Sequence, residues 1–180
     1  MSDQPDFTRF LATAELADLG PGPRKGVQTL SALQEQLKPL LEASKLPLEH
    51  QELVRSLVLL WHDHLDAAHT IAQSIDNADG AFVHGIMHRR EPDFGNAAYW
   101  FRRVGQHPAF SAIASQGAAL LNSVSKSELA VNLVRDGTWD PFAFINACAS
   151  APSASEPAQR LLRQIQKVEF NALLDLLARD

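Results

Sequence analysis

The sequence contains almost no cysteine, no long apolar run and no excess of basic residues. Cys148 is the single cysteine among 180 residues, so the chain cannot form an internal disulfide. The longest strongly apolar run, Leu57 to Trp61, is much too short to cross a bilayer. The formal net charge of −5 argues against a general nucleic-acid surface, which needs a basic face. We therefore expect neither a membrane nor a nucleic acid as a partner.

The chain also has no segment in which β-branched and polar residues alternate, as they do in a half-buried strand. Helical periodicity recurs instead, which predicts an all-α bundle of about six to eight helices. Residues 1–26 end in a Gly- and Pro-rich stretch and are expected to form an arm packed on the surface, with residues 27–180 as a single all-α domain. The first ten residues are acidic and have no apolar centre, so we expect no signal peptide and a cytoplasmic protein.

Periodicity and capping residues predict the order of the helices. Expected N-caps are Asp79 and Asp93, and Ser125–Glu128 matches a capping box. The first helix is expected to begin near residue 28 and to be kinked or ended by Pro39. Further helices are expected over about 48–74, 79–91, 93–104, 108–121, 129–134 and 141–148. A last helix is expected from the end of the linker 149–157 to the C-terminus.

Histidine is concentrated in one part of the chain, where six of the seven histidines lie between residues 62 and 107. Two triplets have the spacing i, i+4, i+7, which places each triplet on one helical face. The triplets are His62, Asp66 and His69 on one helix, and His84, His88 and Glu91 on the next. Residues 75–80 favour a chain reversal between them. A central antiparallel hairpin would then bring the six side chains together in three layers, 62 with 91, 66 with 88 and 69 with 84.

We interpret these six residues as a metal site, in which His62, Asp66, His69, His84, His88 and Glu91 are candidate ligands. Imidazole and carboxylate ligands suit Zn, Fe, Mn or Ni. Positions i and i+7 lie about 10 Å apart along the axis, so a single ion would use a pair from each helix, whereas two ions could share the set. A metal-dependent enzyme built on this site would activate water or polarise its substrate, with Asp66 or Glu91 as ligand or general base and an arginine holding an anionic group.

Two other interpretations remain open at this point. In the first, a metal-free pocket binds a small anionic ligand through arginine, and neighbouring polar and aromatic side chains orient it. Its candidate residues are Arg55, Arg89, Arg90, Asn96, Tyr99, Trp100 and Arg103. In the second, the histidines and carboxylates form a buried hydrogen-bond network in an interaction protein without chemistry.

The same part of the chain carries a recognisable pattern of longer motifs. They are WHDHLD at Trp61–Asp66, HGIMHRREPD at His84–Asp93, Asn96, and YWFRR at Tyr99–Arg103. In these motifs the chain resembles an uncharacterised bacterial and fungal protein family. The resemblance implies no activity and assigns no role to a residue.

Overall fold

The computed structural model describes residues 5–123 and 132–179. Within these ranges the protein is all-α, as predicted, with eight α-helices and one small β-hairpin. The α-helices are α1 (Leu30–Ala43), α2 (Leu48–Trp61), α3 (Leu65–Ala72), α4 (Ala78–Arg90), α5 (Phe94–Val104), α6 (Ala109–Ser123), α7 (Pro141–Ser150) and α8 (Glu156–Leu177). Two 3-10 helices, η1 (Thr8–Leu11) and η3 (Ala151–Ser153), and the antiparallel strands β1 (Val134–Arg135) and β2 (Thr138–Trp139) complete the described fold.

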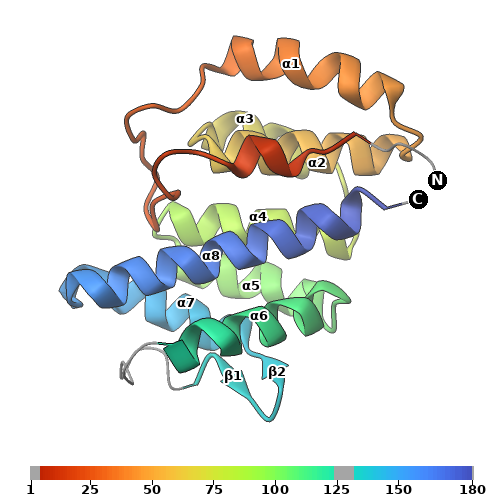
Figure 1. Cartoon of the computed structure of the whole chain (residues 1–180). Coiled ribbons are helices and arrows are strands. Elements are labelled where there is room, and N and C mark those ends of the chain that lie inside the picture. Colours follow the sequence, from red (N-terminus) through yellow and green to blue (C-terminus); the bar gives the residue numbers. More distant parts are fainter. Residues whose placement is uncertain (1–4, 124–131, 180) are drawn as a thin grey trace.

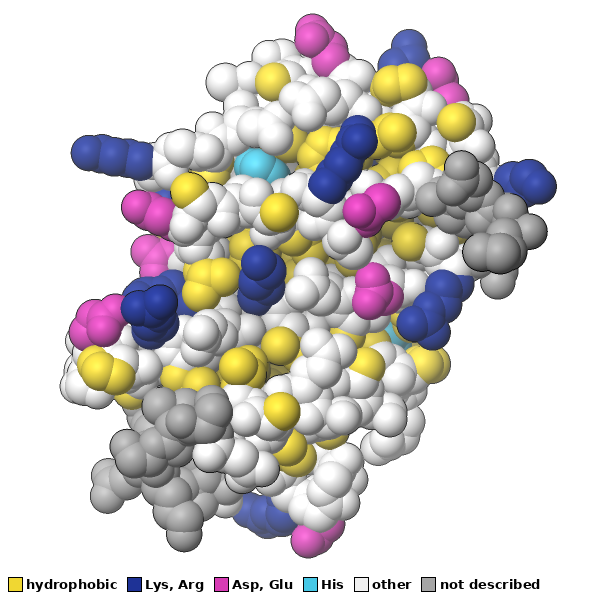
Figure 2. Space-filling view, in the orientation of Figure 1, with side chains coloured by type: hydrophobic (Ala, Val, Ile, Leu, Met, Phe, Trp, Pro, Cys, Tyr) yellow, Lys and Arg dark blue, Asp and Glu magenta, His cyan; other side chains and the backbone are white. Residues whose placement is uncertain are grey.

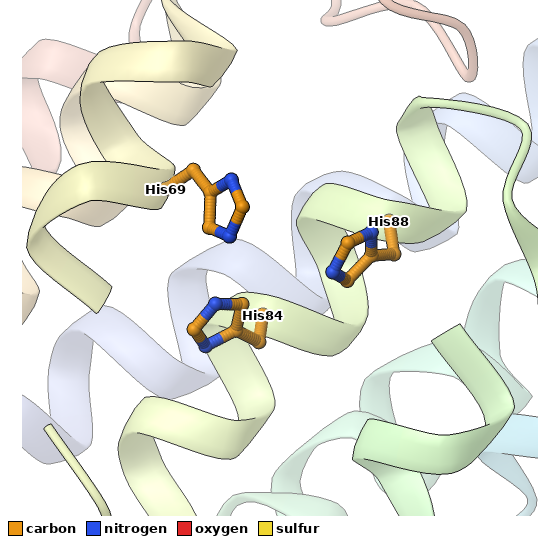
Figure 3. A group of neighbouring side chains, drawn as sticks. All are labelled: His69, His84 and His88. Atoms are coloured by element: carbon orange, nitrogen blue, oxygen red, sulfur yellow. The ribbon is translucent and has the colours of Figure 1, made fainter. Parts of the chain in front are cut away.

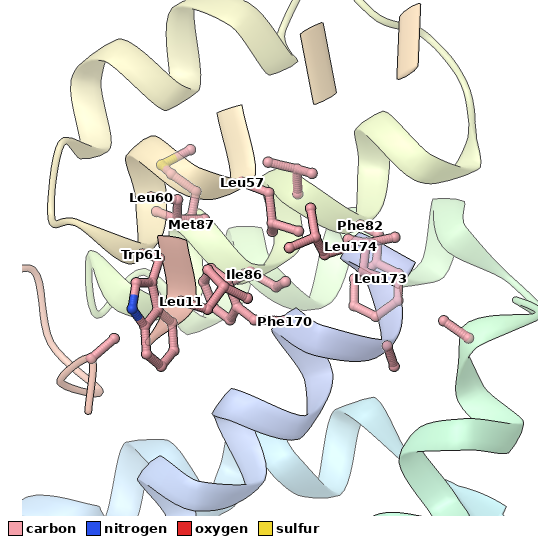
Figure 4. Close-up of a cluster of buried hydrophobic side chains, with 14 of the residues drawn as sticks. Leu11, Leu57, Leu60, Trp61, Phe82, Ile86, Met87, Phe170, Leu173 and Leu174 are labelled. Carbon is pink, nitrogen blue, oxygen red and sulfur yellow. The ribbon is translucent and has the colours of Figure 1, made fainter. Parts of the chain in front are cut away.

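The helices are stacked in layers (Figure 1). Helix α1 covers α2 and α3, the long helix α8 lies across the middle beside α4, and α5, α6 and α7 form the opposite side. Figure 4 shows the centre of the core, where side chains of α2, α4 and α8 interdigitate. The indole of Trp61 meets the ring of Phe170 edge-on, with 5.1 Å between ring centroids. Helix α4 therefore lies between two layers, which explains why its residues from Gly80 to Arg90 are buried.

The segment before α1 contributes to this core. Phe7, Phe10, Leu11 and Ala17 are all buried, and η1 contacts both α2 and α8. The sequence predicted an arm packed on the surface, but burial of apolar side chains gives this segment a share of the hydrophobic stabilisation. Its position also lets its backbone meet polar side chains at the end of α2, as described below.

The prediction of one continuous helix over 48–74 is wrong. Helix α2 ends at Trp61, α3 begins at Leu65, and Asp63 between them has a left-handed backbone with φ of 67°. The hydroxyl of Ser56 donates to the carbonyl of Ala68 at 2.8 Å, so α3 folds back along α2.

Tertiary contacts hold this break in the helix. The fully buried carboxylate of Asp63 accepts from the backbone N and Nη1 of Arg24, at 2.9 and 2.8 Å, and from Nη2 of Arg90 at 2.6 Å. Arg90 also donates to the carbonyl of Leu60, at the end of α2. The charged hydrogen bonds compensate a backbone conformation that is unfavourable for a residue other than glycine.

Local signals predicted several helix ends correctly. Asp93 caps α5 by accepting from the N of Asn96 at 3.1 Å, and Asp140 caps α7. Helix α4 is capped by Asn77, not by Asp79, because the Asn77 side chain accepts from the N of Gly80 at 2.8 Å.

Two further expectations concern α1 and the segment after α6. Pro39 lies inside α1, which continues to Ala43, so the proline does not end this helix. The capping box Ser125–Glu128 lies outside the described residues, and Val134, which was expected in a helix, pairs with Trp139 in the hairpin.

The surface carries both signs of charge. Figure 2 shows Lys and Arg interspersed with Asp and Glu on the face in view. Among the described residues, no helix combines the length and the apolar character needed to cross a membrane.

Candidate metal centre

Three histidines from two consecutive helices converge on one point. His69 comes from α3, and His84 and His88 come from α4, one helical turn apart. Each can offer one ring nitrogen such that the three nitrogens lie within 4.8 Å of one another. Figure 3 shows the three rings turned toward the space between α3 and α4. His84 and His88 are only 2% and 8% exposed, and His69 is half-buried.

The rings have a defined mutual orientation. His84 and His88 are nearly parallel, at 14°, and the indole of Trp100 in α5 stacks on His84 at 4.1 Å and 7°. His69 lies edge-on to both, at 84° to His84 and 71° to His88. Trp100 therefore covers one face of His84 and restricts its rotation, while the edge of His69 completes the group.

Burial disfavours the charged form of His84 and His88. It lowers the pKa of His84 to about 4, and the neighbouring His69 and His88 add to this effect, which a backbone interaction with Gly80 only partly offsets. Burial also lowers the pKa of His88, although the carboxylate of Glu91 opposes the shift. Both rings are neutral at pH 7, and neutral imidazole is the form that binds metals. Nδ1 of His84 is buried without a hydrogen-bond partner.

His88 has two further polar contacts. Its Nδ1 lies 3.1 Å from Oε2 of Glu91, which follows α4 directly. The side-chain nitrogen of Asn96, on α5, lies 3.3 Å from Nε2 and 3.5 Å from Nδ1 of the same ring. Glu91, predicted as a ligand or general base, thus lies beside His88, and Asn96, predicted to contact substrate, lies near both ring nitrogens.

His62 does not reach this cluster. Its Nε2 bonds to the carbonyl of Phe10 at 2.9 Å, and its Nδ1 accepts from the N of Gln28 at 3.3 Å. These partners make His62 a neutral ring that anchors the segment before α1, and burial lowers its pKa accordingly. The predicted layer of residues 62 and 91 fails because the helix breaks at Asp63. His64 also anchors this segment, since its Nε2 bonds to the carbonyl of Gln28 at 2.8 Å.

Replacing His62 with alanine should therefore weaken the fold and leave metal binding unchanged. Two backbone groups would lose their partner, which costs about 1–3 kcal/mol when the groups are buried. Urea denaturation followed by circular dichroism measures this loss, and zinc titration of the same variant should give the wild-type affinity. A lower zinc affinity with unchanged stability would instead indicate that His62 is a metal ligand.

The remaining predicted site residues lie apart from the three rings. Asp66 is exposed and is not part of the cluster. Arg55 pairs with Glu52 at 3.0 Å on the same helix. Arg103 pairs with Asp76 and lies over the Trp100 ring at 5.3 Å, while Tyr99 is exposed beside that indole.

Arg89 and Arg90 are committed to buried ion pairs. The guanidinium group of Arg89 is fully buried against Glu169, and that of Arg90 is fully buried against Asp63. They therefore hold helices together. Nε of Arg89 has no hydrogen-bond partner, but it is buried, so neither guanidinium group offers an accessible edge to an anionic ligand. The sequence did not reveal Glu169 as a partner because it lies 80 residues from Arg89 and belongs to no motif.

Acid should destabilise the protein in the absence of metal, because burial lowers the pKa values of His84 and His88. A ring whose folded-state pKa is below its unfolded value of about 6.5 takes up a proton more readily in the unfolded state, so stability rises with pH. The contribution of the neutral His84 ring to the free energy of unfolding is complete above about pH 6.5 and is lost as the pH falls toward about 4. Urea denaturation with chelator present should show about 1–2 kcal/mol more loss between pH 7 and pH 5 in wild type than in His84→Gln. Equal losses would contradict a depressed pKa for His84.

No known protein supports or contradicts a role for the three histidines. Comparisons of the chain with protein-family models, with curated proteins and with solved structures gave no significant match.

Proposed function

We propose that the protein binds one divalent transition metal through His69, His84 and His88. The observation that carries this proposal is the convergence of three ring nitrogens within 4.8 Å, two of them from buried rings with lowered pKa values. Ligand nitrogens around a tetrahedral zinc ion lie about 3.3 Å apart, given Zn–N bonds of about 2.0–2.1 Å. Nitrogens that lie up to 4.8 Å apart must therefore move closer together when an ion binds, and His69 is the least buried of the three rings.

The ligand type narrows the choice among Zn, Fe, Mn and Ni. Imidazole suits Zn, Fe and Ni, whereas Mn prefers carboxylate and other oxygen ligands. In the described part of the chain, no carboxylate belongs to the cluster. We therefore place zinc, iron and nickel ahead of manganese.

Three protein ligands leave a fourth coordination position for water or substrate, as in catalytic zinc sites. Because imidazole binds a metal in its neutral form, three such ligands do not compensate the ion's double positive charge, so the open position favours an anion. A zinc ion lowers the pKa of a bound water to about 7, which supplies a hydroxide nucleophile near neutral pH. We propose a metal-dependent enzyme that acts on a small anionic substrate, with hydrolysis as the simplest reaction.

A metal-free site is the second candidate. It is favoured by the contacts that His88 already makes with Glu91 and Asn96, and by the stacking of Trp100 on His84. In that case the histidines form a polar lining for a ligand without a metal.

Elemental analysis separates the two candidates. Untagged protein, purified without chelator and incubated with zinc, nickel, iron or manganese before desalting, should retain close to one equivalent of zinc, iron or nickel and much less manganese. His50→Ala, which removes a histidine outside the cluster, should retain the same amount. Retention of none of the four metals would overturn the metal site and leave the metal-free candidate.

A further inference from the structure

We propose that Glu91 is a positioning residue, which fixes the imidazole of His88 with its proton on Nδ1 and its Nε2 lone pair directed at the metal. This inference rests on the proposed metal site. It differs from the sequence-based interpretation, in which Glu91 was a ligand or a general base.

The contact between the two side chains follows from the end of α4. His88 lies in the last turn of the helix, and Glu91 is its C-cap residue three positions later, so the carboxylate reaches back to the ring. Oε2 lies 3.1 Å from Nδ1, and the His88 side chain is only 10% exposed. A carboxylate only accepts hydrogen bonds, and an imidazole that binds a metal is neutral, so the single proton of the ring is on Nδ1, which faces Oε2 of Glu91. Nε2 is then the nitrogen that keeps a lone pair.

Asn96 does not compete with Glu91 for this role. Its amide nitrogen is almost equidistant from the two ring nitrogens, at 3.3 and 3.5 Å. The two nitrogens face away from each other across the ring, so one amide cannot lie along both. These long contacts constrain the ring less than the charged hydrogen bond from Nδ1 to the carboxylate does.

A carboxylate behind a ligating histidine has a known physical effect. It fixes the tautomer and the orientation of the ring and increases the basicity of the nitrogen that binds the metal. Loss of such a partner typically lowers metal affinity 10–100-fold. Because Glu91 is exposed, it can be replaced with little effect on the core.

The test compares three variants by zinc titration. We expect Glu91→Ala to lose 10–100-fold in zinc affinity and Glu91→Gln to lose less, because its amide oxygen still accepts from Nδ1. Asp66→Asn serves as the matched control: it removes a nearby exposed carboxylate that lies outside the cluster, and it should stay within about twofold of wild type. Circular dichroism checks that each variant is folded.

The tautomer is measured independently in the zinc-free protein. Nitrogen-15 shifts of the His88 ring, assigned with His88→Gln, should show protonated Nδ1 in wild type and Glu91→Gln, and a mixture of tautomers in Glu91→Ala. Wild-type zinc affinity and an unchanged tautomer in Glu91→Ala would overturn the positioning role. Complete loss of zinc binding in Glu91→Gln would also overturn it, because Glu91 would then be a ligand. If wild type binds no zinc, the metal site fails, while the tautomer result still decides whether Glu91 orients the ring.

Discussion

Replacing Glu169 with leucine is expected to destabilise the protein by about 3–5 kcal/mol, because the variant leaves the Arg89 guanidinium charged and unpaired in the core. Both side chains are fully buried, and Nη1 and Nη2 of Arg89 meet the two carboxylate oxygens at 3.0 and 2.5 Å. The remaining neighbours, Gln166 at 3.4 Å and the Phe144 ring at 4.4 Å, cannot neutralise the charge. Urea denaturation followed by circular dichroism measures the loss.

The double variant Arg89→Met, Glu169→Leu provides the control. It removes both charges and replaces them with apolar side chains, which is often neutral or stabilising for a buried ion pair. We therefore expect it to recover most of the stability lost in Glu169→Leu. A single variant that loses less than 1 kcal/mol, or a double variant that is less stable than the single one, would show that the pair is not held as two buried charges.

This ion pair also illustrates what the sequence could and could not predict. Periodicity predicted most of the helices, because apolar stripes and polar caps such as Asp93 act within a few residues. Pairing of Arg89 with Glu169 depends on how α4 and α8 pack, and no local pattern encodes it. Arg89 and Arg90, which were interpreted as ligand-binding residues, are paired with the distant carboxylates of Glu169 and Asp63.

In the candidate site, too, features that depend on local spacing were predicted, and features that depend on tertiary contacts were not. Spacing correctly brought together His69, His84 and His88, because all three positions depend only on helical periodicity and one chain reversal. The prediction failed at His62, where it assumed a continuous helix. Nothing local breaks that helix: the residue with positive φ is Asp63, and the carboxylate is held there by Arg24 and Arg90 from other segments. A tertiary contact overrode local propensity.

The break has a consequence for the geometry of the metal centre. Since α3 folds back along α2, His69 is carried on a short helix of eight residues that is tied to α2 by the Ser56–Ala68 bond. His84 and His88 are instead fixed in a buried helix and covered by α5. In the proposed metal site, His69 is therefore the ligand that could adjust its position.

Replacing His69 with alanine is accordingly expected to remove metal binding with little cost to the metal-free fold. His69 is half-buried, so the zinc-free variant should lie within about 1 kcal/mol of wild type. Loss of one of three ligands should lower zinc affinity at least 100-fold, since two imidazoles from one helix cannot enclose the ion. Zinc titration gives the affinity, and urea denaturation with chelator gives the stability.

Zinc should also stabilise the wild-type fold by mass action. At a free zinc concentration 100 times the Kd, the free energy of unfolding should increase by about 2.7 kcal/mol. Thermal unfolding should therefore shift upward with zinc in wild type and in His50→Ala, and should shift much less in His69→Ala at the same concentration, where the gain is at most about 0.4 kcal/mol. A shift of equal size in His69→Ala would place the zinc elsewhere on the chain. The three histidines would then be a hydrogen-bonding and stacking group, and the search for a ligand would turn to the metal-free alternative.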